Sequence, residues 1–178
     1  MPIRGFAALL LASAVAGPAL GEVKSVASDG FEVESAVTIA APPDRVYSAL
    51  GEIGLWWSSS HTFSHDAANL SIELHAGGCF CERLKDGGSV AHMVVVYAAP
   101  GVGLRLRGAL GPLQAEGVDG ALSWTLKPAE GGTSVTQSYV VGGYIRGGME
   151  PWAPRVNRVL DEQLQRLKSF VEGKSLPE

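Results

Sequence analysis

The chain has 178 residues, of which 46% are hydrophobic and 18% are charged, and its formal net charge is −4. A mildly acidic chain without a basic run is not expected to bind nucleic acid, and no cationic amphipathic helix indicates attachment to a membrane surface. This length is typical of one domain that buries a large core, so folding requires neither a metal nor a disulfide.

The first 21 residues have the three regions of a secretory signal peptide. Arg4 is their only charged residue, residues 5–17 are almost entirely apolar, and small residues (Ala19 and Gly21) precede the expected cleavage site. A membrane anchor is the alternative, but the apolar run is short for crossing a bilayer. We therefore expect a periplasmic or secreted protein without a later membrane segment. Residues 22–30 would form a polar tail, 31–173 one domain and 174–178 a second tail.

The next two segments predict a strand followed by a short amphipathic helix. Residues 31–40 alternate between apolar and polar, as a strand does. Residues 41–57 (APPDRVYSALGEIGLWW) carry two prolines near their start, which suit a first helical turn. The expected apolar face comprises Val46, Ala49, Leu50, Ile53 and Trp57. Trp57 is thus expected to anchor the core, and Trp56 to line a cavity. Residues 58–68 are polar and predict an irregular or short helical connector.

The rest of the chain predicts a sheet and one long helix. Six segments with strand character end at Gly, Pro or Asp turn residues: 69–76, 79–85, 89–99, 104–110, 121–127 and 133–141. A long helix with an apolar stripe then runs from Pro154 to about Glu172. This order predicts an α+β fold, in which a curved antiparallel β-sheet wraps around a long C-terminal α-helix and a short helix follows the first strand.

This layout resembles the START-like (SRPBCC, helix-grip) superfamily. The residues that carry the resemblance are 41–47 (APPDRVY), 55–57 (LWW), 77–80 (GGCF) and the helix over 156–171. These segments are most similar to the bacterial branch that includes activator-of-Hsp90-ATPase-like proteins and polyketide cyclases. The resemblance implies a cavity between the sheet and the C-terminal helix for an apolar or amphipathic small molecule. It does not imply one chemistry, because the fold serves carriers, cyclases, receptors and co-chaperones.

Glu82 is the strand residue with the strongest indication of a functional role. It shares a face with Phe80 and Leu84, whereas Cys79 and Cys81 take the other face. The same alternation places Glu73, Arg105 and Arg107 on the solvated outer face. His92, within an apolar strand, is expected to be a core histidine with its hydrogen bonds satisfied.

Two connectors carry residues that could face a ligand. His61 and His65 have the i,i+4 spacing of a helical metal site, but the serine-rich segment favours a polar loop at the cavity mouth, and we predict no metal or cofactor. The glycine-rich segment 142–148 lacks the lysine of a phosphate-binding loop. It is either a lid, with Tyr144 and Met149 facing inward, or a simple connector.

The two cysteines, Cys79 and Cys81, lie at positions i and i+2 of one predicted strand. Their Cα atoms would then sit at the upper edge of disulfide reach. A strained, reducible bridge is one possibility. The alternative, which we favour, is two thiols packed as small apolar groups.

These features favour a protein that binds a small apolar or amphipathic ligand in the cavity. The expected ligand-binding residues are Trp56, His61, Phe63, Glu82, Trp124, Tyr139, Tyr144 and Met149. One alternative is a cyclase- or lyase-type enzyme that uses acid–base groups in the same cavity. Another is a protein-binding module, which an exposed apolar patch would favour. The ligand and the oligomeric state are left open.

Overall fold

The computed structural model describes residues 21–177. The expected signal peptide therefore falls almost entirely outside the described residues. The chain runs in the order β1 (Glu22–Ala27), β2 (Gly30–Ile39), α1 (Pro43–Gly51), β3 (Leu70–Ile72), β4 (Cys79–Arg83), β5 (Ser89–Ala99), β6 (Gly103–Arg107), β7 (Gly117–Ala129), β8 (Gly132–Tyr144) and α2 (Ala153–Val171). Short 3₁₀ turns lie between some of these elements: η1 (Ile53–Leu55), η2 (Ser59–His61), η3 (Ala67–Asn69), η4 (Lys85–Gly87) and η5 (Gly111–Ala115).

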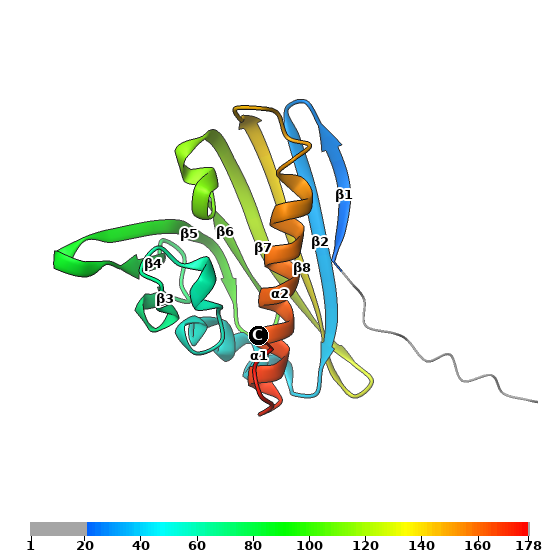
Figure 1. Cartoon of the computed structure of the whole chain (residues 1–178). Helices are drawn as coiled ribbons and strands as arrows, with labels where there is room; N and C mark the ends of the chain where they lie inside the picture. Colours follow the sequence, from blue (N-terminus) through cyan, green and yellow to red (C-terminus); the bar gives the residue numbers. More distant parts are fainter. Residues whose placement is uncertain (1–20, 178) are drawn as a thin grey trace, which may run out of the picture.

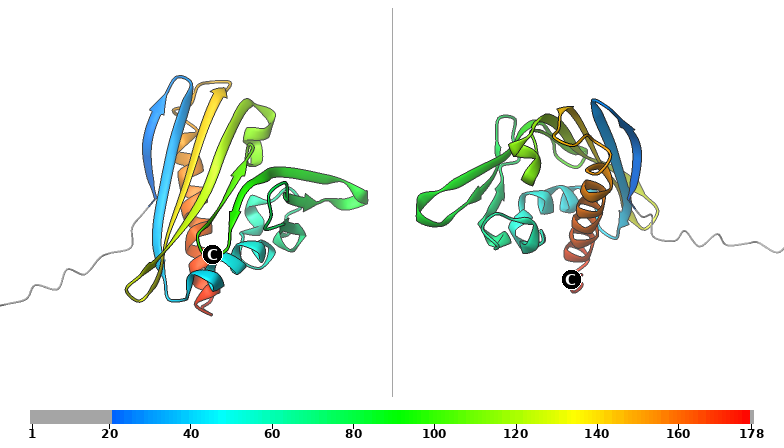
Figure 2. Two further views of the ribbon diagram at one scale, coloured as in Figure 1. Left: turned by 180° about the vertical axis from the view of Figure 1, so that it is seen from behind. Right: turned by 45° about the horizontal axis from the view of Figure 1, so that its top comes forward.

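The strands form one antiparallel sheet in the order β1-β2-β8-β7-β6-β5-β4-β3. The sheet is curved, and α2 lies along its concave side in front of β2, β8 and β7 (Figure 1). Seen with its top brought forward, the sheet wraps around α2 while α1 and the 3₁₀ turns lie beside the helix (Figure 2). The expected α+β helix-grip architecture is confirmed.

Residues 22–27, expected to belong to a polar tail, instead form the edge strand β1. This strand pairs with β2, and Val26 lies opposite Phe31. Most of its residues are exposed and only Val23 packs against the core, so its attachment rests mainly on hydrogen bonding to β2. Polar composition alone could not distinguish such an edge strand from a tail, because an edge strand has little need of apolar residues.

The expected helix over residues 41–57 ends early, at Gly51. Its first turn has Pro43 and the acidic Asp44, as predicted. A Cβ at Gly51 would lie 3.0 Å from the Leu74 side chain, and one at Gly54 would lie 3.0 Å from the Ala67 carbonyl. The backbone therefore approaches its neighbours closely here, and the chain continues as the tighter turn η1.

This change of helix type exchanges the expected positions of the two tryptophans. Trp56 is fully buried, and its indole N–H donates to the Ala49 carbonyl at 2.7 Å. Trp57 is also largely buried, but it lines the cavity described below. Trp56 is therefore the core anchor and Trp57 the cavity residue, the reverse of the prediction.

The long helix α2 is fastened to the sheet by a buried polar chain. The Gln137 amide accepts from the Trp124 indole N–H at 2.8 Å and donates to the Leu160 carbonyl at 2.8 Å. Because both groups are buried, leaving either unpaired would be costly. This chain fixes how far α2 sits above β7 and β8. Among the described residues, no helix is long and apolar enough to cross a membrane.

Candidate functional site

A cavity of about 430 Å³ lies between α2, the inner face of the sheet and the connector after α1. This volume is within the range of small-molecule sites, roughly 300–1,000 Å³. Apolar side chains form most of its wall: Trp57, Phe63, Leu70, Phe80, Leu110, Pro112, Leu113, Trp152, Val156, Val159 and Leu160. Polar groups are few: Ser60, His61, Thr62, His92 and Arg155. Such a lining suits a mainly apolar ligand whose orientation is set by a few polar contacts.

His92 reaches the cavity because β5 contains a bulge. In the register with β4, Phe80 pairs with Met93 and Cys81 pairs with Ala91, so His92 is the extra residue. His92 and Met93 are consequently both buried although they are neighbours in sequence. A bulge re-aims a side chain in this way. The expected burial of His92 is confirmed, but its place in a cavity wall could not be read from strict alternation.

Glu82 is fully buried and makes three short contacts. Its carboxylate accepts from the backbone N–H groups of Phe63 at 3.1 Å and Ser64 at 2.5 Å, and lies 2.9 Å from His92 Nε2. Burial favours the neutral acid, but the hydrogen bonds from Ser64, Phe63 and His92 outweigh it and lower the pKa of Glu82. Burial lowers the pKa of His92, although Glu82 opposes this effect. The pair is therefore an ionised carboxylate beside a neutral imidazole near pH 7.

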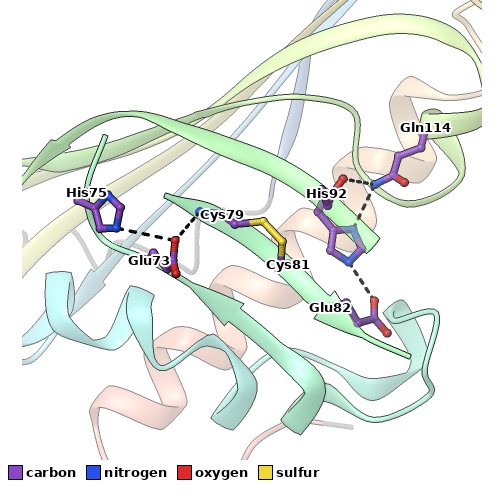
Figure 3. The surroundings of a disulfide bond; sticks show 8 residues. Glu73, His75, Cys79, Cys81, Glu82, His92 and Gln114 are labelled. Atoms are coloured by element: carbon purple, nitrogen blue, oxygen red, sulfur yellow. Dashed lines mark hydrogen bonds and ion pairs between the residues drawn. A yellow bond between two sulfur atoms is a disulfide. The ribbon is translucent and has the colours of Figure 1, made fainter. Parts of the chain in front are cut away.

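The neutral imidazole has one defined tautomer in this arrangement. The ionised Glu82 can only accept, so His92 Nε2 carries the hydrogen and Nδ1 is left as an acceptor. The side-chain amide of Gln114 lies 3.4 Å from Nδ1, a long contact (Figure 3). The rings of Phe63 and Phe80 lie 5.9 Å and 4.9 Å from the imidazole. His92 thus presents a weakly engaged base among aromatic side chains at the cavity wall.

The connector over residues 58–66 forms one side of the cavity and is held from two directions. Glu82 binds its backbone from the sheet side. From the helix side, Gln163 accepts from the Ser58 backbone N–H at 2.8 Å, and Glu162 lies 3.1 Å from His61 Nε2. Phe63 remains 48% exposed at the cavity mouth. The connector is a wall whose position depends on these side chains.

The structure brings together only part of the predicted site. His61 and Phe63 line the cavity, and Glu82 supports it from behind without lining it. Trp124 and Tyr139 are core residues outside the lining; the Tyr139 hydroxyl donates to the Gly108 carbonyl at 3.1 Å and accepts from Leu110 N–H at 3.2 Å. Burial raises the pKa of Tyr139. Through Leu110, this tyrosine supports the wall formed by residues 110–113.

The glycine-rich segment 142–148, at the end of β8, differs from the expected inward-facing lid. Tyr144 ends β8 and is 71% exposed, so it points to solvent and not into the cavity. Met149 is buried, but it does not line the cavity. The strand continues further than the glycines suggested, because Gly142 and Gly143 pair with Asp119 and Val118.

Sequence reasoning missed several lining residues. Trp152 immediately precedes α2, Arg155 and Val159 come from its N-terminal half, and Leu113 comes from the turn η5. The helical stripe identified the buried face of α2, but not which part of that face meets a cavity and which part meets the sheet. Arg155 is an exposed cation at the mouth, and no sequence pattern distinguished it from other surface arginines.

The connector does not form the helix that would place His61 and His65 on one face. His65 has a left-handed backbone (φ 59°), so residues 61–65 are not a helix and do not present two imidazoles on one face. Among residues 21–177 there is no group of three His, Cys, Asp or Glu side chains that could hold a metal ion. The polar-loop interpretation of this segment is the one that the structure supports.

Comparisons with known proteins place this fold and cavity in context. Protein MLL2253 from Mesorhizobium loti shares 16% identity and a TM-score of 0.59, and the match covers 82% of this chain and 99% of that chain. A protein of unknown function from Staphylococcus aureus, SA2116, shares 14% identity and a TM-score of 0.59, over 82% and 95% of the two chains. At this identity the similarity demonstrates the fold alone. No curated protein matches the chain in sequence.

The family comparison is more specific. The family model described as polyketide cyclase / dehydrase and lipid transport matches residues 30–172, which is nearly the whole described region. The polyketide cyclase-like part of the expected resemblance is thereby confirmed, and the resemblance to the activator of Hsp90 ATPase stays a prediction. The chain belongs to the polyketide cyclase / dehydrase and lipid transport family, a family of ligand-binding helix-grip domains.

Proposed function

We propose that this protein binds a hydrophobic or amphipathic small molecule in the cavity between the sheet and α2. The observation that carries the proposal is the cavity of about 430 Å³ with its predominantly apolar wall. Burial of apolar ligand surface there would supply most of the binding free energy, at about 25 cal/mol per Å². Arg155 and His61 at the mouth and His92 deeper inside would orient the polar end of the ligand.

A cavity-filling variant tests this proposal. Val159 lies on α2 within the cavity wall, so Val159→Trp fills the space without adding charge. Val96 is 47% exposed, and Val96→Trp is the matched control. Binding of the amphipathic dye 1-anilinonaphthalene-8-sulfonate should weaken at least about tenfold in Val159→Trp, a loss of about 1.4 kcal/mol in binding free energy. It should stay unchanged in Val96→Trp. Equal binding by both variants would place the dye elsewhere and contradict the proposal.

Native mass spectrometry of the protein purified from its own compartment would detect a natural ligand that co-purifies with it. We expect a mass adduct that is present in the wild type and absent in Val159→Trp.

Export itself is proposed from the pattern of residues 1–21, in which Arg4 is followed by an apolar run and small residues. Fractionation of cells should recover a shortened chain outside the cytoplasm. A full-length cytoplasmic chain would contradict export.

A second candidate function is acid–base catalysis in the same cavity. The specific observation is the buried contact of 2.9 Å between His92 and Glu82 at the cavity wall. His92 Nδ1 could accept a proton from a carbon next to a carbonyl group, with Glu82 stabilising the resulting imidazolium. A probe is a 3-hydroxyacyl thioester, from which loss of the α-proton and the β-hydroxyl group as water forms an absorbing enoyl thioester. Turnover by the wild type that His92→Gln abolishes, with cooperative unfolding of the domain retained, supports this function. Absence of turnover despite bound probe contradicts it.

A further inference from the structure

The two cysteines are joined in the structure. Cys79 and Cys81 form a disulfide with their Cα atoms 5.3 Å apart, which corrects the expectation of two packed thiols. Disulfide-bonded residues usually have Cα atoms 4.4–6.8 Å apart, and residues two apart on a straight strand reach the upper limit of that range. The 5.3 Å separation of Cys79 and Cys81 is well inside that range, and the two residues flank the point of β4 that faces the His92 bulge of β5.

This disulfide can do little for folding. The stabilisation from a crosslink increases with the length of chain that it closes, and this one spans two residues. The domain also buries a continuous core that includes Phe80 and Trp56. A contribution to the stability of the fold therefore does not explain this disulfide. Labile, catalytic or regulatory disulfides are in general the exposed or strained ones.

The bond lies on the outer face of the sheet. Cys79 and Cys81 are both partly exposed, whereas their neighbours Phe80 and Glu82 face the interior. Cys81 pairs with Ser71 on β3 and with Ala91 on β5, and both of these small residues are exposed. A small thiol can therefore approach the sulfur atoms from solvent without any strand opening.

The charges around the two sulfur atoms are unequal. The Glu73 carboxylate lies beside Cys79, whose backbone N–H donates to it at 3.2 Å (Figure 3). Arg83 is two residues beyond Cys81 on the same outward face of β4. Such spacing, about 7 Å along a strand, is within the screening length of physiological salt. Of the two cysteines, Cys79 thus has a carboxylate at its backbone, and Cys81 has an arginine two residues along β4.

We propose that Cys79–Cys81 is a thiol–disulfide exchange site of the folded protein, with a low-molecular-weight thiol of the glutathione type as its reaction partner. The thiolate of that molecule attacks Sγ of Cys79, the sulfur–sulfur bond breaks, and its electron pair leaves on Sγ of Cys81. A mixed disulfide remains at Cys79. The thiolate of a second small thiol attacks the sulfur of the first one in that mixed disulfide. This step releases Cys79 as a thiolate together with the oxidised small-molecule disulfide. Two electrons pass to the protein. The site lies outside the cavity and does not depend on the ligand-binding proposal.

The first test separates exchange in the folded state from exchange through unfolding. The reference is the oxidised peptide of residues 77–83, in which both sulfur atoms are freely accessible. Glutathione should reduce the folded protein within about tenfold of the peptide's rate, with no acceleration in low urea. Exchange that required global unfolding would be at least about a thousandfold slower, because the unfolded fraction of a stable domain is that small or smaller. That slower rate, rising with urea, would overturn the proposal.

The second test concerns which cysteine leaves. In Cys79→Ser the remaining thiol is at position 81, and in Cys81→Ser it is at position 79. Iodoacetamide should alkylate the former several-fold faster at pH 7, and Arg83→Gln in the Cys79→Ser background should remove most of that advantage. Arg107→Gln, an exposed arginine on β6, is the matched control. Equal alkylation of the two single-cysteine variants would overturn the assignment of Cys81 as the leaving group.

Discussion

Glu82 Oε2 lies 2.9 Å from His92 Nε2, and both side chains are buried at the wall of the cavity. The same carboxylate also accepts the backbone N–H groups of Phe63 and Ser64. One buried carboxylate thus fixes a histidine tautomer and the position of the connector that closes one side of the cavity. This double role makes the cavity sensitive to the charge of Glu82.

Replacement of Glu82 by Gln should therefore loosen the connector. The amide oxygen can accept hydrogen bonds, but the amide nitrogen cannot, so at least one of the two backbone N–H groups loses its partner. We expect the free energy of unfolding to fall by about 2–3 kcal/mol, as for other buried hydrogen bonds to a charged group. Denaturant unfolding measures this loss, and hydrogen exchange should locate it at residues 62–66. The exposed Glu73, changed to Gln, is the control. An unchanged exchange pattern in Glu82→Gln would contradict the role assigned to its carboxylate.

His92 should make the stability of the protein depend on pH. Because burial lowers its pKa below 6.5, the unfolded chain binds a proton more readily than the folded one. The unfolding free energy should therefore decrease as the pH falls below about 6.5, and this component should be absent in His92→Gln. Urea unfolding of both proteins between pH 8 and pH 5 provides the comparison, with the exposed His75→Gln as control. Parallel pH profiles for wild type and His92→Gln would rule out this contribution.

The two tryptophans should respond differently to replacement by Phe. Trp56→Phe removes the buried hydrogen bond to Ala49 and leaves a void in the core, so it should lower the free energy of unfolding by about 2–4 kcal/mol. Trp57→Phe should mainly weaken binding of the dye, because Trp57 lines the cavity. Unfolding curves and dye titrations of both variants decide the matter. Weaker dye binding in Trp56→Phe than in Trp57→Phe would show that the assignment is reversed.

Glu172 should stabilise the fold in a defined range of pH. It directly follows α2 as the C-cap residue, accepts from the Ala40 backbone N–H at 3.0 Å and pairs with Lys168 at 3.0 Å. Burial opposes ionisation, but the contacts with Lys174, Ala40 and Lys168 lower the pKa of Glu172 to about 2. Its contribution is therefore complete above about pH 4.5 and is lost as the pH falls towards 2.

We expect Glu172→Gln to lower the free energy of unfolding by about 1–3 kcal/mol at pH 7, and by progressively less between pH 4.5 and pH 2. Urea unfolding at several pH values gives this difference directly. The exposed Glu130, changed to Gln, should have almost no effect at any pH. A constant difference between wild type and Glu172→Gln down to pH 2 would exclude the ionised form as its cause.

Local patterns in the sequence predicted most of the fold. Alternation and turn residues located the strands β2 and β4 to β8, and the apolar stripe located α2, because secondary structure of this kind follows from side-chain periodicity. The burial of Glu82 was also implicit in its alternation with Cys79 and Cys81. The edge strand β1 was missed. It pairs with β2 on one side alone and needs few apolar residues, so its sequence resembles that of a polar tail.

The cavity wall depended on departures from regular periodicity. A single bulge in β5 turns His92 inward, and the tightening of the chain after Gly51 exchanges Trp56 and Trp57. Both departures arise where backbones from distant parts of the chain approach each other, and no local pattern records such an approach. The sequence by itself determined most of the strands, the long helix and the buried carboxylate, because these follow from the periodicity of side chains along the chain. Only the tertiary structure decided which side chains face the cavity and that the two cysteines are joined, because both depend on how separate segments pack against one another.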